Sequence, residues 1–507
     1  MKNIIYLLSS ILLFSSCDLN EELQDSITKE NSNAILGPVQ ALETAYTQLQ
    51  SFQNNDFQFM LQEHPSDEMA GPTRGADWDD NGVWRSLHLH TWTPENARII
   101  ASFSQLYKGL AFAIDVQSFK GITPSQNAQS VFLQSLYIFY ITDLFGQVSM
   151  RAPGEAVGNL PSIQLKRTEA IDFAISKLEA VLNDLPDGSS SSANIANKNA
   201  GNALLAKMYI NKAVYKATDS NGQPQIGPFV FSTTDMDKVI AYSNAAMLGR
   251  TLQNNYFENF GPNNGEISNE LIFTSKNSST LGGEIRRFSV MTLHYNQKPN
   301  GWNGFVGLTD LYNKFDDQSD IRFKSNVTGL TDVSGLNGGI LVGQQKNKDG
   351  ENILDRQGNP LIFTQNFDLQ NSTEEKGMRV MKYFADYSKP ERPSNDFVFL
   401  RLGDVMLLKA EALARKGNLA DALTIINTIR DKRGAAQITS LTMDKILDER
   451  GRELYWEGHR RNDQIRFSKF HLPVQQRSTT SSANKLIFPI PLNALAANPN
   501  LFQNPGY

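Results

Sequence analysis

The sequence predicts a mainly α-helical protein in which tetratricopeptide-like helix pairs form a scaffold, with a loop-rich ligand face and minor β-hairpins. Two observations predict the helices: apolar residues recur at helical spacing, and small residues alternate with large ones in paired segments. A third predicts the loops, because residues 218–396 are rich in Gly, Asn and Asp and carry only short apolar alternations. We therefore expect a scaffold from residues 38–217 and 397–470, with a loop-rich insertion at 218–396.

The clearest helix pair lies near the C-terminus. There the small residues Ala410 and Ala422 let two helices approach each other, while Gly417 and Asn418 form the turn between them. Helical periodicity also begins after Pro38. Further helices with the same character are expected at residues 95–118, 127–145, 167–184 and 198–216.

One β-hairpin is expected inside the loop-rich insertion. The turn-forming pairs Asp349-Gly350 and Gly358-Asn359 punctuate short apolar strands at residues 352–354 and 361–364. Loops that project from a rigid helical frame commonly carry recognition residues.

The N-terminus has the order of an export signal: Lys2, an apolar run over residues 4–14, and two serines before Cys17. The run is shorter than the roughly 20 residues that span a bilayer. It resembles a relaxed lipobox, although Phe14 departs from the strict pattern, and ordinary secretion with a free thiol is the alternative. We expect a lipoprotein signal peptide at 1–16, a lipid anchor at Cys17, a lipidated tether at 17–36 and one folded domain at 37–507.

Composition excludes several classes of protein. The 48 basic and 53 acidic residues give a formal net charge of −5, which argues against a nucleic-acid partner. The single cysteine excludes an intramolecular disulfide and a cysteine-based metal cluster. The 29 Phe, 15 Tyr and 5 Trp supply many flat surfaces, most of which must lie in the core.

Ordered blocks across the C-terminal part resemble the SusD/RagB family. Earlier matches occur at 204–209, 269–273 and 310–312, so that the resemblance covers nearly the whole mature chain. The C-terminal blocks are Phe399–Val405, Lys409–Ala412, Ile426–Gly434, Ile446–Leu454, Glu457–Asp463, Ile465–Phe467, Phe488–Pro491 and Gln503–Tyr507.

The resemblance implies a nutrient-binding lipoprotein of the outer membrane. Such a protein binds an oligosaccharide or polysaccharide and acts as the lid and capture subunit of a SusC-like TonB-dependent transporter. The acidic residues directly after Cys17 resemble a signal for the cell surface. The charged residues of the blocks are expected to form scaffold ion pairs rather than a catalytic site; they are Glu449, Arg450, Arg452, Glu453, Arg460, Arg461 and Asp463.

A sugar ring has a C–H face and a hydroxyl edge, so its site should combine an aromatic plane with carboxylates, amides and guanidinium groups. Three of the five tryptophans lie at 78, 84 and 92, beside polar loop residues. Trp78 and Trp84 are expected to be more exposed than Trp92, with packing against the helical frame as the alternative. The candidate glycan-binding residues are Trp78, Trp84, Trp302, Asp67, Arg74, Asp79 and Asn81.

The residues 77–82 also resemble the start of a calcium loop, but His88 replaces the expected closing Glu. We therefore expect no metal site and no cofactor, with structural calcium as a minor alternative. Arg74 and Arg85 would suit an acidic sugar and the neighbouring carboxylates a neutral one, and we favour a neutral glycan.

Two other functions remain as alternatives. The first is a tetratricopeptide-type binder of peptides or other non-glycan cargo. The second is a carboxylate-dependent glycoside hydrolase, which would need Asp67 or Glu68 to face Asp79 or Asp80 across a cleft. Because no nucleophile elbow, phosphate loop or zinc-helix motif occurs, no catalytic residue is assigned.

Overall fold

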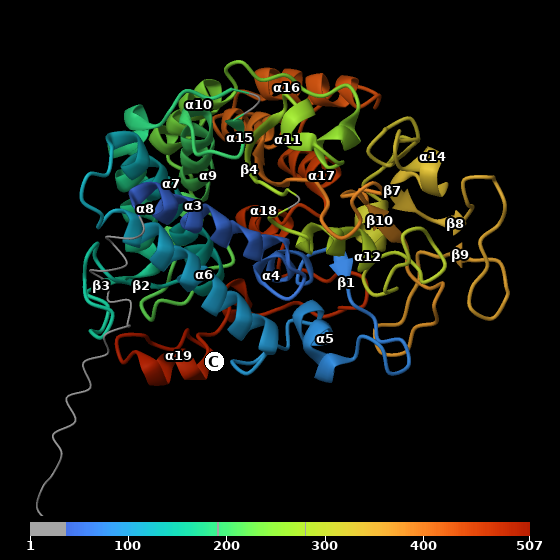
Figure 1. The fold of residues 1–507 in the computed structure, drawn as a ribbon, viewed down its shortest axis with the longest axis horizontal. Coiled ribbons are helices and arrows are strands. Elements are labelled where there is room, and N and C mark those ends of the chain that lie inside the picture. The colour runs from blue at the N-terminus through green and yellow to red at the C-terminus, as the bar shows by residue number, and fades with distance from the viewer. Residues whose placement is uncertain (1–36, 190–191, 279) are drawn as a thin grey trace, which may run out of the picture. The chain divides into compact units, whose positions relative to one another are not determined.

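The structure is a computed structural model that describes residues 37–507 apart from 190–191 and 279 (Figure 1). The expected signal peptide, the anchor Cys17 and the tether at 17–36 lie outside the described residues. Residues Pro38–Tyr507 form one compact unit.

The first half of the scaffold consists of helices that pack against each other in chain order, as expected (Figure 1). The Thr123 hydroxyl caps α7 by accepting a hydrogen bond from the Gln126 backbone amide, and the Gln126 side-chain oxygen accepts from the Thr123 backbone amide. The helices are α3 (Pro38–Thr47), α6 (Ala97–Val116), α7 (Pro124–Phe145), α8 (Arg167–Val181) and α9 (Lys198–Lys216). α6 is long and apolar enough to cross a membrane, but half of its apolar window is buried inside the protein.

A helix at α10 (Thr233–Ala246) corrects the expected boundary of the scaffold, because it lies in the segment predicted to be mostly loops. It packs against α9 and α15 (Leu402–Arg415) and so continues the helical series. Its buried stripe is thin, with Met236 and Val239 as its only large apolar members. A stripe this thin is easily missed among polar residues.

The C-terminal half of the scaffold confirms the expected helix pair. α15 packs against α16 (Leu419–Lys432) and α17 (Met443–Leu454), and α18 (Arg460–Arg466) follows α17. Gly417 has a φ of +87°, the left-handed conformation that ends α15 without a Cβ penalty. The Asn418 side chain then caps α16 by accepting from the Asp421 amide.

The strands are short and pair antiparallel. β11 (Phe397–Arg401) pairs with β4 (Leu271–Ser275), and both are buried. The predicted hairpin is present, since bridges join Lys346 to Asn352 and Leu354 to Pro360. The remaining pairs are β1 (Met69–Ala70) with β5 (Val306–Gly307), β2 (Val148–Met150) with β3 (Ile163–Leu165), β8 (Gly343–Gln344) with β9 (Ile362–Phe363), and β7 (Gly338–Leu341) with β6 (Lys324–Ser325) and β10 (Arg379–Met381).

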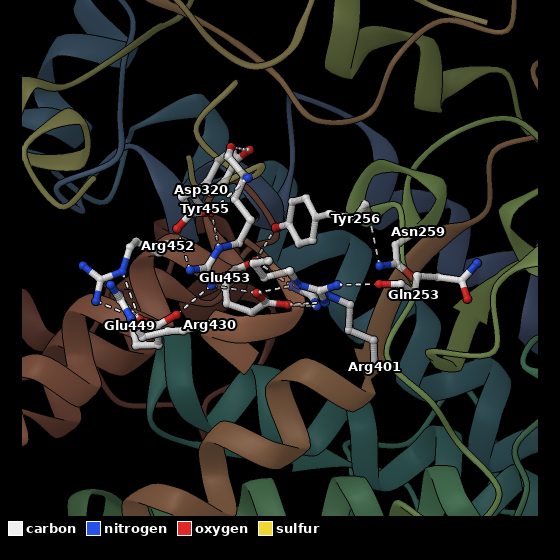
Figure 2. Close-up of polar contacts among 12 residues, drawn as sticks. Gln253, Tyr256, Asn259, Asp320, Arg401, Arg430, Glu449, Arg452, Glu453 and Tyr455 are labelled. Carbon is white, nitrogen blue, oxygen red and sulfur yellow. Dashed lines mark hydrogen bonds and ion pairs between the residues drawn. The ribbon is translucent and has the colours of Figure 1, made fainter. Parts of the chain in front are cut away.

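A buried ion-pair network holds α17 to the segments around it (Figure 2). The Glu453 carboxylate accepts from Arg401 at 2.7 Å, from Arg433 at 2.8 Å and from Arg322 at 2.9 Å. One turn earlier, Glu449 accepts from Arg430, from Arg452 and from Arg322, which it shares with Glu453. The charged blocks therefore form scaffold ion pairs, as expected from the sequence, and these pairs are buried rather than exposed.

Replacing Glu453 with Gln should destabilise the protein by about 3–5 kcal/mol, because removing one partner leaves buried guanidinium charges uncompensated. The measurement is urea unfolding at neutral pH. As a control, Asp187→Asn removes a surface ion pair with Lys198 whose carboxylate is 89% exposed, and the unfolding midpoint should stay at its wild-type value. A Glu453→Gln protein with the wild-type midpoint would contradict the role of the network.

Two buried glutamates connect α4 (Gln58–Glu63) to the turn after α17. Glu63 accepts from the Gly458 amide at 2.6 Å, and Glu68 accepts from the Trp456 amide at 3.0 Å. Burial raises the pKa of Glu68 to about 7, and Asp67 adds to this rise while Arg460 opposes it. Burial and the neighbouring Glu68 also hold the pKa of Glu63 well above its usual range. The pair therefore retains a proton near neutral pH.

The raised pKa predicts a pH dependence of stability. An unfolded Glu releases its proton near pH 4.3, whereas folded Glu68 holds it until about pH 7. The stability that this proton contributes is complete below the unfolded pKa and is lost as pH rises through the folded pKa. Glu68→Gln should therefore lose less stability than the wild type between about pH 5 and about pH 8.

Urea unfolding midpoints at the two pH values measure this difference. An exposed carboxyl, Glu266, provides the matched control, and Glu266→Gln should follow the wild-type pH dependence. Equal pH dependence in Glu68→Gln and the wild type would show that Glu68 does not carry the proton.

Candidate functional site

The pairing of β1 with β5 brings two distant loops together. Met69 lies opposite Gly307, so the loop after β1 meets the loop before β5. There the Trp78 indole N–H donates to the Trp302 carbonyl at 3.0 Å, and the two ring centroids lie 6.3 Å apart. Both tryptophans are half-buried. Two expected site residues that are 224 positions apart thus form one aromatic surface.

Close packing fixes the Trp78 ring. It contacts Phe305 with centroids 4.8 Å apart, and a Cβ on Gly304 would lie 2.4 Å from the ring. Trp78 itself has a φ of +63°, which is rare for a residue with a large side chain. The surrounding contacts therefore hold the backbone in a conformation that it would not adopt alone.

Tyr295 completes the aromatic surface. Its hydroxyl donates to Asp77 at 3.1 Å, and the Arg356 guanidinium lies 4.1 Å from the centre of its ring. Another guanidinium, that of Arg287, lies 5.5 Å from the Trp302 ring centre. We call Trp78, Tyr295 and Trp302 the aromatic platform.

Two depressions border the aromatic platform. The first has a volume of about 410 Å³ and is lined by Asp77, Trp78, Asp80, Tyr295, Gly301 and Trp302. The second has a volume of about 720 Å³, and its polar lining includes Arg74, Asn303, Arg356 and Glu374. Tyr295 lines both, so the two depressions share this side chain as a common wall.

An ionised carboxylate organises the second depression. Glu374 accepts from Arg356 at 2.8 Å and lies 2.6 Å from the buried His294 ring nitrogen. Although burial opposes ionisation, hydrogen bonds from His294, Arg356 and Gln357 lower the pKa of Glu374 to about 2. Burial also lowers the pKa of His294. The carboxylate thus stays charged and fixes Arg356 over Tyr295.

Arg74 forms a buried wall of the second depression. Its guanidinium donates to the backbone carbonyls of Thr373 and, at 2.8 Å, of Lys376. Burial lowers its pKa to about 10, so the side chain remains charged at neutral pH. This sequence-predicted residue therefore lies at the site, mainly as support for the loop at 373–376.

Two predicted site residues lie elsewhere. Trp84 is 1% exposed, so the expectation that it would be exposed is wrong. Its indole donates to Asp80 at 2.7 Å beneath the Trp78 ring. Asp67 is buried against Arg460 and Lys314, which outweigh the cost of burial and hold its pKa well below the usual range. Both residues are parts of the scaffold.

Asp79 and Asn81 lie on the loop beside the aromatic platform but line neither depression. Asp79 pairs with Arg85, and this hydrogen bond is the main cause that lowers its pKa. Asn81 is exposed, with a φ of +55°. These two residues therefore flank the site rather than form it.

Sequence reasoning missed Tyr295, Arg356 and Glu374. Tyr295 lies seven positions before Trp302 in the same Gly- and Asn-containing loop, which is a signal that could have identified it. Arg356 and Glu374 come from loops with no aromatic or motif signal. Only the tertiary arrangement shows that they belong to the site.

The carboxylates of the calcium-like loop bond to protein donors: Asp77 to Tyr295, Asp79 to Arg85 and Asp80 to Trp84. Within residues 37–507, apart from 190–191 and 279, no group of three or more His, Cys, Asp or Glu is placed to hold a metal ion. His88 and His90 both bond to backbone carbonyls in the interior.

The arrangement required for a glycoside hydrolase is also not formed by the proposed pairs. Asp67 and Glu68 are buried and line neither depression, whereas Asp80 lines the first. The depressions thus offer an aromatic surface bordered by carboxylates, amides and guanidinium groups, which is an arrangement suited to binding.

The chain is similar in sequence to a known protein family and to two of its named relatives. Residues 248–478 match the model of the SusD family. The starch-binding protein SusD of Bacteroides thetaiotaomicron is 24% identical, with 89% of this chain and 85% of that protein covered. The SusD-like protein P38 of Formosa agariphila is 31% identical over 27% of this chain and 29% of its own length.

Solved structures share the fold. A SusD superfamily protein from Parabacteroides distasonis has a TM-score of 0.70 at 18% identity, over 95% of this chain and 100% of the other. Surface glycan-binding protein A from Bacteroides thetaiotaomicron, solved in complex with laminarihexaose, has a TM-score of 0.66 at 19% identity, over 92% and 98%. The chain therefore shares the helical fold of SusD superfamily structures, and its residues 248–478 carry the sequence pattern of the SusD family.

Proposed function

We propose that this chain is a glycan-binding protein and that the aromatic platform of Trp78, Tyr295 and Trp302 is its binding surface. The observation that carries the proposal is the approach of Trp78 and Trp302 from distant loops, with Tyr295 between two depressions. Aromatic faces bind the C–H face of a sugar, and bordering polar groups bind its hydroxyls. Relatives named for binding starch and laminarin support this reading.

The charges around the aromatic platform favour a neutral glycan. The lining contains two guanidinium groups and five carboxylates, and the guanidinium groups are engaged by protein acceptors. An acidic sugar would be repelled by this excess of negative charge. The carboxylates are Asp77, Asp80, Asp355, Glu374 and Glu375.

The proposed activity is capture without chemistry. A glycoside hydrolase needs a carboxylic acid that can donate a proton, usually with a raised pKa. At this site the pKa of Glu374 is lowered. Partial burial opposes ionisation of Glu375, but hydrogen bonds and the nearby Lys376 lower its pKa as well. Both side chains are therefore ionised at neutral pH and unsuited to act as the acid.

The proposed cellular role rests on the family and on Cys17. We place the protein on the outer membrane, at the cell surface, with Cys17 acylated and the residues that follow it as a tether. There it would act as the lid and capture subunit of a SusC-like TonB-dependent transporter. The match of residues 248–478 to the SusD family model supports this role, as does the single cysteine behind an apolar N-terminal run.

Affinity gel electrophoresis tests the binding surface. The wild-type protein should be retarded in gels with one neutral polysaccharide from a panel of starch, laminarin, xylan, mannan and dextran, and should not be retarded by alginate or pectin. Trp302→Ala should weaken binding about 30-fold, because a central aromatic contact is worth about 2 kcal/mol. The thermal midpoint should remain at the wild-type value.

The matched control is Phe502→Ala, which removes a 72%-exposed aromatic side chain that lines neither depression. Its affinity should equal that of the wild type. If no polysaccharide in the panel retards the wild type, or if Trp302→Ala binds as the wild type does, the proposed surface is wrong. Release of new reducing ends from the polysaccharide would contradict capture without chemistry.

A further inference from the structure

The loop from His294 to Asn303 separates the aromatic platform from a further depression. Tyr295, Gly301 and Trp302 face the platform side. Lys298, Pro299 and Asn300 of the same loop line a depression of about 400 Å³, whose opposite wall is formed by residues 384–395. We call it the Tyr387 depression, after its half-buried aromatic residue.

The Tyr387 depression has an apolar floor. Ile285, Val290 and Phe384 line it and are each less than 10% exposed. Three prolines, at 299, 390 and 393, add rigid apolar walls. A depression with such a floor can contact the C–H face of a sugar ring without first ordering flexible side chains.

Polar groups surround this floor. The Tyr387 hydroxyl donates to the Lys298 carbonyl at 2.7 Å, which fixes the ring against the loop. The Lys298 ammonium lies 5.8 Å from the ring centre. At the outer rim, Arg286 and Glu391 form an exposed ion pair at 3.3 Å. The rim therefore offers donors and acceptors of both charges, as a hydroxyl-rich ligand requires.

Asn300 stands between the two binding surfaces. It lines the Tyr387 depression, whereas its neighbour Gly301 lines the platform side. Consecutive Cα atoms are only about 3.8 Å apart, so the two surfaces share one narrow ridge. Asn300 is exposed, and within the part of the chain that the structure describes its side-chain amide makes no hydrogen bond to another residue. That amide can bind hydroxyls of a chain that crosses the ridge.

One short helix supports both surfaces. Arg287, the first residue of α12 (Arg287–Val290), lies over the Trp302 ring. Ser289 and Val290 of the same turn line the Tyr387 depression. Because a single helical turn supports both, the distance between the two surfaces is fixed before a ligand arrives. A ligand that touches both therefore gains contacts without reorganising the protein.

We propose that the Tyr387 depression is a second glycan subsite, which takes further sugar residues of the same chain that is bound at the aromatic platform. The inference rests on the proposed function, since it needs a glycan at Trp302. It narrows the ligand class to a polysaccharide, or to an oligosaccharide long enough to reach from the aromatic platform over the ridge at Asn300 into the Tyr387 depression. Affinity should then increase with chain length until both surfaces are filled.

Isothermal titration calorimetry with an oligosaccharide size series tests the proposal. The series, from disaccharide to decasaccharide, is prepared by partial hydrolysis of the neutral polysaccharide that retards the wild-type protein in the gel panel. The wild type should bind the longest members more tightly than the shortest. Tyr387→Ala and Asn300→Ala should each weaken binding of the longest members about tenfold and leave the shortest unchanged. Trp302→Ala should weaken binding at every length.

Two variants guard against misfolding and general effects. Asn300 is exposed, so Asn300→Ala tests the ridge even if Tyr387→Ala lowers the thermal midpoint. Tyr242→Ala, which removes another half-buried tyrosine on α10, should bind the whole series as the wild type does.

The outcomes separate the two proposals. If Tyr387→Ala and Asn300→Ala both bind the longest members with wild-type affinity while Trp302→Ala does not, the second subsite is overturned and the platform stands. If Trp302→Ala has no effect at any length, the proposed function fails, and the second subsite fails with it.

Discussion

The salt bridges between Glu453 and three buried arginines are the interaction on which the rest of the structure depends. Arg401 ends β11, Arg433 follows α16, and Arg322 belongs to a loop in the insertion. These segments are far apart in the chain, and their arginines all donate to one carboxylate on α17. Such pairs are costly to bury and are tolerated only with complete hydrogen bonding. The three guanidinium groups supply it, so the segments can meet in one arrangement.

The same C-terminal region positions the candidate site. Just after α17, Trp456 donates from its backbone and its indole to Glu68, and Arg460 pairs with Asp67. These contacts hold the chain directly before β1. Since β1 pairs with β5, the position of β1 determines where the loops that carry Trp78 and Trp302 meet. The charged C-terminal blocks thus contribute to function through support of the aromatic platform.

Sequence patterns predicted the parts of the fold that depend on local periodicity. The helices of the first scaffold half and the pair α15 and α16 follow from regular apolar spacing. The ion pairs were expected from the charged residues of the C-terminal blocks, which lie on α17 and α18 or just before α18. α10 was missed because few apolar residues mark its buried stripe. A helix that buries only a narrow face has few apolar residues at helical spacing, so its sequence shows only weak periodicity.

The site was predictable only in part. Trp78 and Trp302 stood out because tryptophan in a polar loop is unusual, but Trp84 has the same signal and is buried. Neighbouring residues alone do not show which ring packs inward. Tyr295 and Glu374 line the same depression, and His294 bonds to Glu374 across 80 positions of the chain. Pairings of this kind have no local pattern to reveal them.

The most direct test is the crystal structure of the protein soaked with an oligosaccharide from the neutral polysaccharide that it binds. A sugar ring should lie on Trp302 beside Tyr295, with the chain continuing past Asn300 toward Tyr387. Electron density for the sugar elsewhere, such as the apolar groove between α6 and α19 (Leu492–Ala497), with the aromatic platform empty, would contradict the account.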